Sequence, residues 1–263
     1  MLSAQSPFPC TFAVAAAKKR TLRFGFINDL DDSSTWAPLM DILAEYLRTY
    51  QEGSRDTSLV VFFRPQATVR SLHKYHERFW AVLQYLHEQD PGLWPADVPE
   101  DPDDPMWEFG YGGESIFVVC NTPAHTRRRS RFSPGFVITF QPRWVFEGLE
   151  PESPRGIAAR RVIRKRLREF DGGPPSTTLG NYGDPTNREW RQYFLPDRNS
   201  DADMGCPFRH RDSGPRVEVM STPRFRPAAT GRVLQRGMAA HRRALHQRML
   251  AEAGLDTRSY ASC

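Results

Sequence analysis

The stretch that decides the fold is residues 107–147, WEFGYGGESIFVVCNTPAHTRRRSRFSPGFVITFQPRWVFE. Two runs within it, Ser115–Asn121 and Gly135–Gln141, are apolar and rich in β-branched residues, which predicts two buried strands. The connection between the runs is too short for a crossover helix, so we expect the strands to be antiparallel. Because this connection is polar and contains two prolines, we expect it to lie outside the core.

The connection carries one histidine, His125, followed by a cluster of arginines. Two rigid strands that present an imidazole beside several guanidinium groups could hold an anionic ligand that bears a metal. The same residues also allow a simpler reading, a solvated basic loop. The sequence leaves both interpretations open.

Patterns on either side of this stretch predict further elements. Strands are expected at residues 8–14, at Thr21–Ile27 and at Ser58–Arg64. Apolar residues at helical spacing predict helices over residues 36–50, 69–86, 152–170 and 229–253. Strands and helices do not alternate strictly, which favours an α+β fold: a mainly antiparallel or mixed sheet flanked by helices, with long Pro-rich loops.

Composition narrows the class of protein. The chain has 263 residues, 39% of them hydrophobic, which is ample for a core. Its net charge of +5 arises from 36 Lys and Arg against 31 Asp and Glu, a balance that does not indicate nucleic acid. We find no signal segment and no apolar run of membrane-spanning length, so the expected location is cytoplasmic, with no membrane partner. The four cysteines are scattered, which argues against a disulfide scaffold and a zinc ribbon: Cys10, Cys120, Cys206 and Cys263.

Common catalytic motifs are absent from the sequence. There is no GxGxxG, no GxxxxGK[ST], no GxSxG and no HExxH. This disfavours nucleotide-dependent enzymes of the usual types, α/β hydrolases and zinc proteases. Candidate functional residues must therefore be sought as clusters.

One such cluster surrounds the glycine turn before the central strand. Glu108 and Glu114 bracket this turn among several aromatic residues. A carboxylate in an aromatic wall can bind a planar cation such as guanidinium, and an acid at a strand edge is the alternative. Gln141, Arg143 and Trp144 end the next strand and could line the same pocket.

Three other residues are candidates for metal binding or core packing. Cys206 could ligate iron as a thiolate, although a small buried side chain is the more ordinary role. His210 lies four residues further on and could also serve. His76 falls on the apolar face of a predicted helix, which favours a satisfied core histidine.

Several blocks of the sequence resemble the YqcI/YcgG family. They include FWAVLQYLHEQDPGLWP (Phe79–Pro95), FVVCNTPAHTRRRSR (Phe117–Arg131) and LGNYGDPTNREWRQYFLPD (Leu179–Asp197). The resemblance covers roughly residues 8–208, with the blocks in family order. Members of this family include haem-dependent N-hydroxylases that act on guanidino groups. The resemblance therefore implies a haem monooxygenase with haem b, O₂ as co-substrate and an external electron donor or reductase.

The resemblance also implies a substrate and a set of roles. L-arginine, a small guanidino substrate, would be converted to Nω-hydroxy-L-arginine, as in antibiotic biosynthesis of the D-cycloserine type. His125 is the expected iron ligand, with Cys206 or His210 as alternatives. The remaining roles are haem contacts for Arg127, Arg131, Arg143 and Trp144, and substrate contacts for Glu108 or Glu114 with Gln141.

The expected organisation is a haem-binding domain over residues 1–215 and a C-terminal extension, 216–263. The amphipathic helix of the extension would pack on the domain or form the seam of a homodimer. Two other functions stay open on the sequence alone. One is a haem-binding sensor or carrier without turnover. The other is a basic nucleic-acid-binding module that uses the arginine connection and the helix over 152–170.

Overall fold

A computed structural model describes residues 7–201 and 204–211. The chain divides into two compact units, Met1–Asp212 and Ser213–Cys263, and all described residues belong to the first. The predicted helix over 229–253 and the proposed extension lie outside the described residues.

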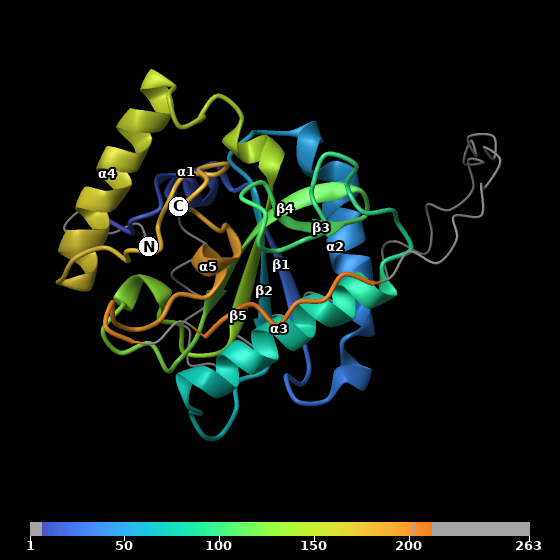
Figure 1. The fold of residues 1–263 in the computed structure, drawn as a ribbon. Helices are drawn as coiled ribbons and strands as arrows, with labels where there is room; N and C mark the ends of the chain where they lie inside the picture. The colour runs from blue at the N-terminus through green and yellow to red at the C-terminus, as the bar shows by residue number, and fades with distance from the viewer. Residues whose placement is uncertain (1–6, 202–203, 212–263) are drawn as a thin grey trace. The chain divides into compact units, whose positions relative to one another are not determined.

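The described part of the chain builds one five-stranded sheet with helices around it (Figure 1). The strands lie in the order β1-β2-β5-β4-β3 and are β1 (Leu22–Ile27), β2 (Ser58–Phe63), β3 (Phe109–Tyr111), β4 (Glu114–Asn121) and β5 (Val137–Pro142). The α-helices are α1 (Thr11–Lys19), α2 (Ala37–Thr49), α3 (Leu72–Gln89), α4 (Pro154–Asp171) and α5 (Trp190–Tyr193). The 3₁₀ turns are η1 (Ser33–Thr35), η2 (Tyr50–Glu52), η3 (Arg129–Arg131) and η4 (Arg143–Phe146).

The sheet is mixed, which confirms the predicted α+β class. β1 pairs with β2 in parallel, and the other three pairings are antiparallel. The antiparallel pairing of β4 with β5, predicted from the short connection, is confirmed, with Cys120 opposite Ile138 and Asn121 opposite Val137. β3 and β4 form a tight hairpin around two glycines of positive φ, Gly112 and Gly113.

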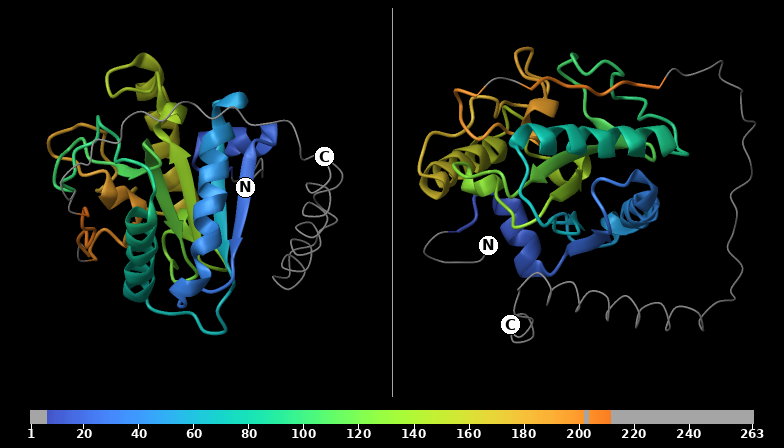
Figure 2. Two further views of the ribbon diagram at one scale, coloured as in Figure 1. Left: turned by 90° about the vertical axis from the view of Figure 1, so that its right-hand side faces the viewer. Right: turned by 90° about the horizontal axis from the view of Figure 1, so that it is seen from below.

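The core lies on the face of the sheet that α2 and α3 cover. Alternate residues of β2 on this face, Leu59, Val61 and Phe63, are buried. α2 approaches β1 so closely that a Cβ on Gly25 would lie 2.9 Å from a side-chain carbon of Ile42. Trp36 at the start of α2 contacts Tyr85 of α3 edge-on, so the two helices lie side by side. α4 stands on the other side of the molecule from α2 in Figure 1 and in the right view of Figure 2.

One local prediction was wrong, and one short strand was missed. The segment predicted as an entering strand at 8–14 forms the start of α1, because its alanines favour a helix and the Cys10 sulfur caps the Ala13 N–H at 3.4 Å. The short strand β3 was not predicted, since three residues beside a glycine turn give no alternation to detect. No helix of the described residues is long and apolar enough to cross a membrane.

Replacing Gly110 by Ala tests the packing of β3 against the Pro-rich loop. An added Cβ would lie 2.5 Å from Pro95 Cδ and 3.0 Å from Trp94 Cε3. We expect the free energy of unfolding to fall by about 1–3 kcal/mol, as in overpacked cores, measured by urea denaturation. Gly53→Ala is the control, because no atom lies within 4 Å of its added Cβ. Equal stabilities of the two variants would contradict this packing.

Candidate functional site

The arginine connection lies only partly outside the core, because Arg127 and Arg129 are exposed whereas other residues of the connection are buried. His125 is buried, and its Nδ1 and Nε2 each lie 2.9 Å from a partner, the Thr122 hydroxyl and the Leu195 carbonyl. A carbonyl only accepts, so Nε2 carries the proton and Nδ1 accepts from the hydroxyl. Burial lowers the pKa of His125 to about 4, which keeps the ring neutral. In this conformation neither ring nitrogen offers a lone pair to iron.

A second contact fastens the same connection to the chain after α5. The carboxylate of Asp197 accepts hydrogen bonds from the backbone N–H groups of Thr126, Arg127 and Arg128, at 2.9–3.2 Å. The Arg128 side chain is buried and donates from Nε to the Pro196 carbonyl. Much of the polar chemistry of this connection is therefore used within the fold.

The arginines expected to hold one anionic ligand do not converge. Arg127 is exposed, and Arg131 donates to the Gln192 carbonyl at 3.1 Å. Arg143 lies beyond the far end of β5, about 20 Å along a six-residue strand. Since Glu108 is beside Arg143, His125 and the candidate acids stand at opposite ends of the β4–β5 pair.

Glu108 lies in a buried acidic pair. Its carboxylate is enclosed, and Arg143 Nε lies 3.1 Å from its Oε2. Among the described residues, no donor meets hydrogen-bond geometry at either carboxylate oxygen of Glu108. Glu189, directly before α5, is the second buried acid and accepts from Gln192 Nε2 at 3.1 Å.

Tyr182 completes the surroundings of this guanidinium. The Arg143 guanidinium carbon lies 3.1 Å from the centroid of the Tyr182 ring. Trp107, beside Glu108, is fully buried. We call Glu108, Glu189 and Tyr182 the guanidinium cage. It has the form expected from the sequence, a carboxylate within an aromatic wall, and the guanidinium it holds belongs to the chain itself.

The two acids of the cage resist ionisation. Burial raises the pKa of Glu108 to about 8 and that of Glu189 to about 7, while Arg143 opposes both shifts. The charge of Glu189 raises the pKa of Glu108 further. Because one guanidinium faces two buried carboxyls, the pair titrates as a unit and retains a proton at neutral pH.

The other predicted substrate residues lie outside the cage. Glu114 accepts a hydrogen bond from the Tyr50 hydroxyl at 3.0 Å, and Gln141 donates to the Ser58 hydroxyl at 2.9 Å. Trp144 packs edge-on against Tyr50. Glu189 was not predicted as a site residue. Its only signal was the dense polar-aromatic set around it, which also fits structural hydrogen bonds.

Tyr193 places α5 beside the cage. Its hydroxyl accepts from the Phe109 N–H at 3.1 Å and donates to the Ile116 carbonyl at 3.3 Å, so one side chain joins α5 to β3 and β4. β3 pairs only with the first three residues of β4, and α5 lies along the remainder. This contact brings Glu189 to Glu108.

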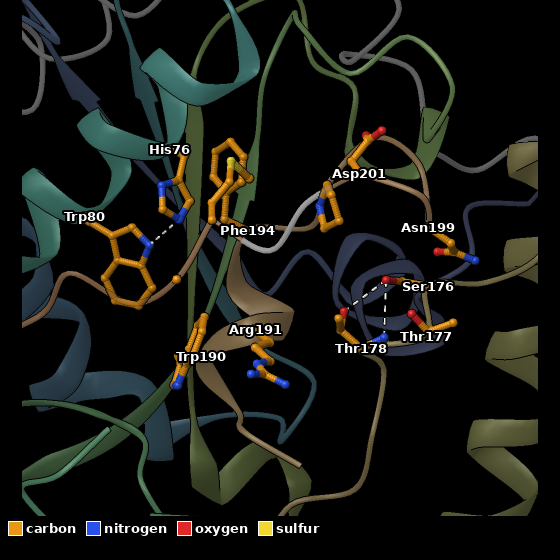
Figure 3. Close-up of a pocket in the computed structure, with 13 residues that line it drawn as sticks. His76, Trp80, Ser176, Thr177, Thr178, Trp190, Arg191, Phe194, Asn199 and Asp201 are labelled. Carbon is orange, nitrogen blue, oxygen red and sulfur yellow. Dashed lines mark hydrogen bonds between the residues drawn. The ribbon is translucent and has the colours of Figure 1, made fainter. Parts of the chain in front are cut away.

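A cavity of about 170 Å³ is lined by residues of α5 and α3 (Figure 3). Its walls include His76, Trp80 and Trp190, with Ser176 and Thr178 opposite. The Trp80 indole N–H donates to His76 Nε2 at 2.9 Å, so this nitrogen is unprotonated. The prediction of a buried histidine at position 76 is confirmed, and the structure adds that it faces a cavity. The remaining lining residues are Thr177, Arg191, Phe194, Pro196, Asn199, Asp201, Met204 and Gly205.

The side chains that line the cavity are of the kinds that bind haem, but the cavity volume of about 170 Å³ is smaller than that of usual ligand pockets. A neutral imidazole, aromatic walls and the arginine Arg191 are the groups that haem sites use for iron, ring and propionates. Ligand pockets usually span about 300–1,000 Å³, so the walls would have to move apart to admit a porphyrin. Trp190 also lines a second pocket, together with Cys206 and Arg209.

The alternative iron ligands have different surroundings. Burial raises the pKa of Cys206 to about 12, so it stays a thiol rather than a thiolate. His210 has its Nδ1 3.5 Å from Glu100, and its Nε2 is buried without a partner among the described residues. Its ring lies 4.8 Å from that of His87, but neither residue lines the cavity.

Taken together, these features define an α+β protein that holds a guanidinium in an acidic, aromatic cage beside an aromatic cavity. The YqcI/YcgG family matches residues 1–209, and the chain belongs to this family. No solved structure matches it.

Relatives at moderate identity cover most of the chain. YcgG and YqcI of Bacillus subtilis are 41% and 39% identical over 206 and 207 residues, which is 77% and 78% of this chain and 81% of each relative. A Streptomyces lavendulae protein named "Putative N(omega)-hydroxy-L-arginine synthase DcsA" is 35% identical over 211 residues, 78% of both chains.

The structural role of His125 can be tested by His125→Ala. The change removes two buried hydrogen bonds and leaves the Leu195 carbonyl unpaired, so we expect unfolding to become easier by about 2–3 kcal/mol. His73→Ala is the control, because the His73 side chain is 66% exposed. A His125 variant as stable as the control would show that the two hydrogen bonds of His125 contribute little.

The titration of the acidic pair predicts how stability depends on pH. A raised pKa means that the folded state binds the proton more tightly than the unfolded state. The protonated pair therefore makes its full contribution to the free energy of unfolding below the pKa that the acids have in the unfolded chain. This contribution is lost as pH rises towards 8. We therefore expect the melting temperature to fall from pH 6 to pH 9, and to fall less in Glu108→Gln. Parallel profiles for the two proteins would refute the assignment.

Proposed function

We propose that this protein is a haem-dependent monooxygenase that hydroxylates a guanidino nitrogen, with L-arginine as substrate and Nω-hydroxy-L-arginine as product. The observation that carries the proposal is the cage, which already holds a guanidinium beside a cavity lined by an imidazole and aromatic rings. The name of the Streptomyces lavendulae relative supports the same chemistry.

In this proposal His76, rather than His125, would hold the haem iron. His76 lines the cavity, whereas His125 does not. The Nε2 of His76 accepts from the Trp80 indole at 2.9 Å, so iron would have to take the place of that donor. Arg191 would pair with a propionate, and Trp80 and Phe194 would pack on the ring. A bound haem supplies the binding and reductive activation of O₂.

The chain's own residues bind and orient the substrate. One ionised carboxylate of the cage would pair with the guanidinium, and the Tyr182 ring would stack on its face. The second carboxyl keeps its proton and can donate a hydrogen bond. Trp107 and Tyr193, both buried, exclude water behind the acids. Glu189 precedes Trp190 directly, so the bound nitrogen would lie next to the cavity wall.

The overall reaction needs an external reductant. Insertion of one oxygen atom of O₂ into an N–H bond, with the other released as water, consumes two electrons and two protons. The proposal therefore includes an electron donor outside this chain and a role in making a hydroxylated arginine, as in biosynthesis of the D-cycloserine type.

The purified protein should be tested for haem and for turnover. We expect a Soret band, a CO complex after reduction, and the gain of one oxygen atom by L-arginine, followed by mass spectrometry. His76→Ala should lose the haem spectrum, while His73→Ala, on the exposed face of the same helix, should keep it. Loss of haem in His125→Ala but not in His76→Ala would restore His125 as ligand.

Other outcomes separate the competing functions. Haem without an oxidised product under reducing, aerobic conditions would favour a sensor or carrier. A protein that binds no haem after reconstitution, and binds DNA with steep salt dependence, would be a nucleic-acid-binding module instead.

A further inference from the structure

We propose that Arg143 is an internal plug: its guanidinium occupies the cage in the absence of ligand and moves out when a free guanidino compound binds. The cage is defined by the contacts of Arg143 with Glu108 and Tyr182, and only the identity of its natural ligand rests on the proposed function.

The cage has more hydrogen-bond acceptors than Arg143 satisfies. Both carboxylate oxygens of Glu108 are buried and lack a donor in hydrogen-bond geometry among the described residues. The Asn181 side-chain oxygen is buried and unpaired in the same part of the chain. Asn187 joins these groups, since its amide donates to the Asn181 carbonyl at 3.0 Å and lies 3.4 Å from Glu189 Oε2. Buried acceptors left unpaired are costly, and a guanidinium supplies five N–H donors.

Arg143 reaches these acceptors from the side. It is attached at η4, immediately after β5, and its Nε lies 3.1 Å from Glu108 Oε2 without hydrogen-bond geometry at either oxygen of that carboxylate. A free guanidinium has no such tether and can turn in the plane above Tyr182 to aim two parallel N–H groups at one carboxylate. The better alignment favours the exchange.

The plug can leave without opening the core. The Arg143 side chain is 27% exposed, whereas that of Glu108 is 1% exposed. The wall beyond it is a loop held to residues 105–106 by two hydrogen bonds, from the Tyr182 hydroxyl to the Met106 carbonyl and from the Gly183 N–H to the Pro105 carbonyl. Arg143 therefore lies on the side of the cage that faces solvent.

The exchange conserves most of the electrostatics. One guanidinium replaces another, so the charge facing Glu108 and Glu189 and the stacking on Tyr182 are unchanged. The affinity for the incoming ligand is reduced by the fraction of time that the plug is in place. Compact or tetrahedral cations lack the planar fork, so the cage should select guanidino compounds over ammonium compounds.

The test uses the full-length chain and methylguanidine as probe. Arg143→Ala should bind methylguanidine at low millimolar concentration, seen by calorimetry and as a rise in melting temperature, at least tenfold more tightly than the wild type. Tetramethylammonium and NaCl at the same concentration should have no such effect. The double variant Arg143→Ala with Glu108→Gln should lose the response, and Arg161→Ala, an exposed arginine on α4, should behave as the wild type.

If Arg143→Ala does not fold, Arg143→Gln takes its place with the same expectations. A melting temperature that responds equally to methylguanidine and tetramethylammonium would overturn the proposal, as would equal affinities of variant and wild type. The readout requires neither haem nor turnover. A protein that binds haem and forms product, but whose Arg143→Ala variant does not bind methylguanidine selectively, would support the oxygenase proposal and contradict the plug. Selective binding of methylguanidine by a protein without haem would support the plug and contradict the oxygenase proposal.

Discussion

The candidate site depends on one buried hydroxyl, that of Tyr193. It bridges the Phe109 N–H and the Ile116 carbonyl, and so closes the open side of β4 where β3 has ended. An unpaired strand edge inside a protein must be satisfied by some donor or acceptor. Because α5 is one turn long, fixing Tyr193 also fixes Glu189 and Trp190. Glu189 of the cage and Trp190 of the cavity wall are thus consecutive residues at the start of the same helical turn.

The buried pair Glu108 and Glu189 does not favour stability of the folded protein. Two buried carboxyls that face one guanidinium keep desolvated acceptors unpaired, and apolar residues of similar size would be less costly. Such groups are usually retained where they serve a ligand. The arginine connection shows the opposite arrangement. There Asp197 and His125 meet their partners fully, and the segment serves to hold the chain after α5 in place.

Local patterns predicted much of the fold because apolar residues recur within most elements at the spacing of a helix or a strand. α2, α3 and α4 were expected within a few residues of their observed limits, and the β4–β5 pairing followed from the length of its connection. The errors arose where composition was read without tertiary partners. A polar segment was expected to lie outside the core, yet His125 and Arg128 are buried, because the chain around Leu195 and Pro196 supplies their partners.

The sequence by itself determined the α+β class and the central antiparallel pair, and it marked Glu108 and Glu114 as two acids among aromatic residues without choosing between them. These features depend on neighbours along the chain. Only the tertiary structure decided that Glu189 and Tyr182 surround Arg143 together with Glu108, that His76 faces a cavity and that His125 does not line it. Each of these depends on contacts between segments distant in the sequence, such as the 70 residues between His125 and Leu195. Periodicity cannot encode such contacts, because it reports which face of an element is buried and not what lies against it.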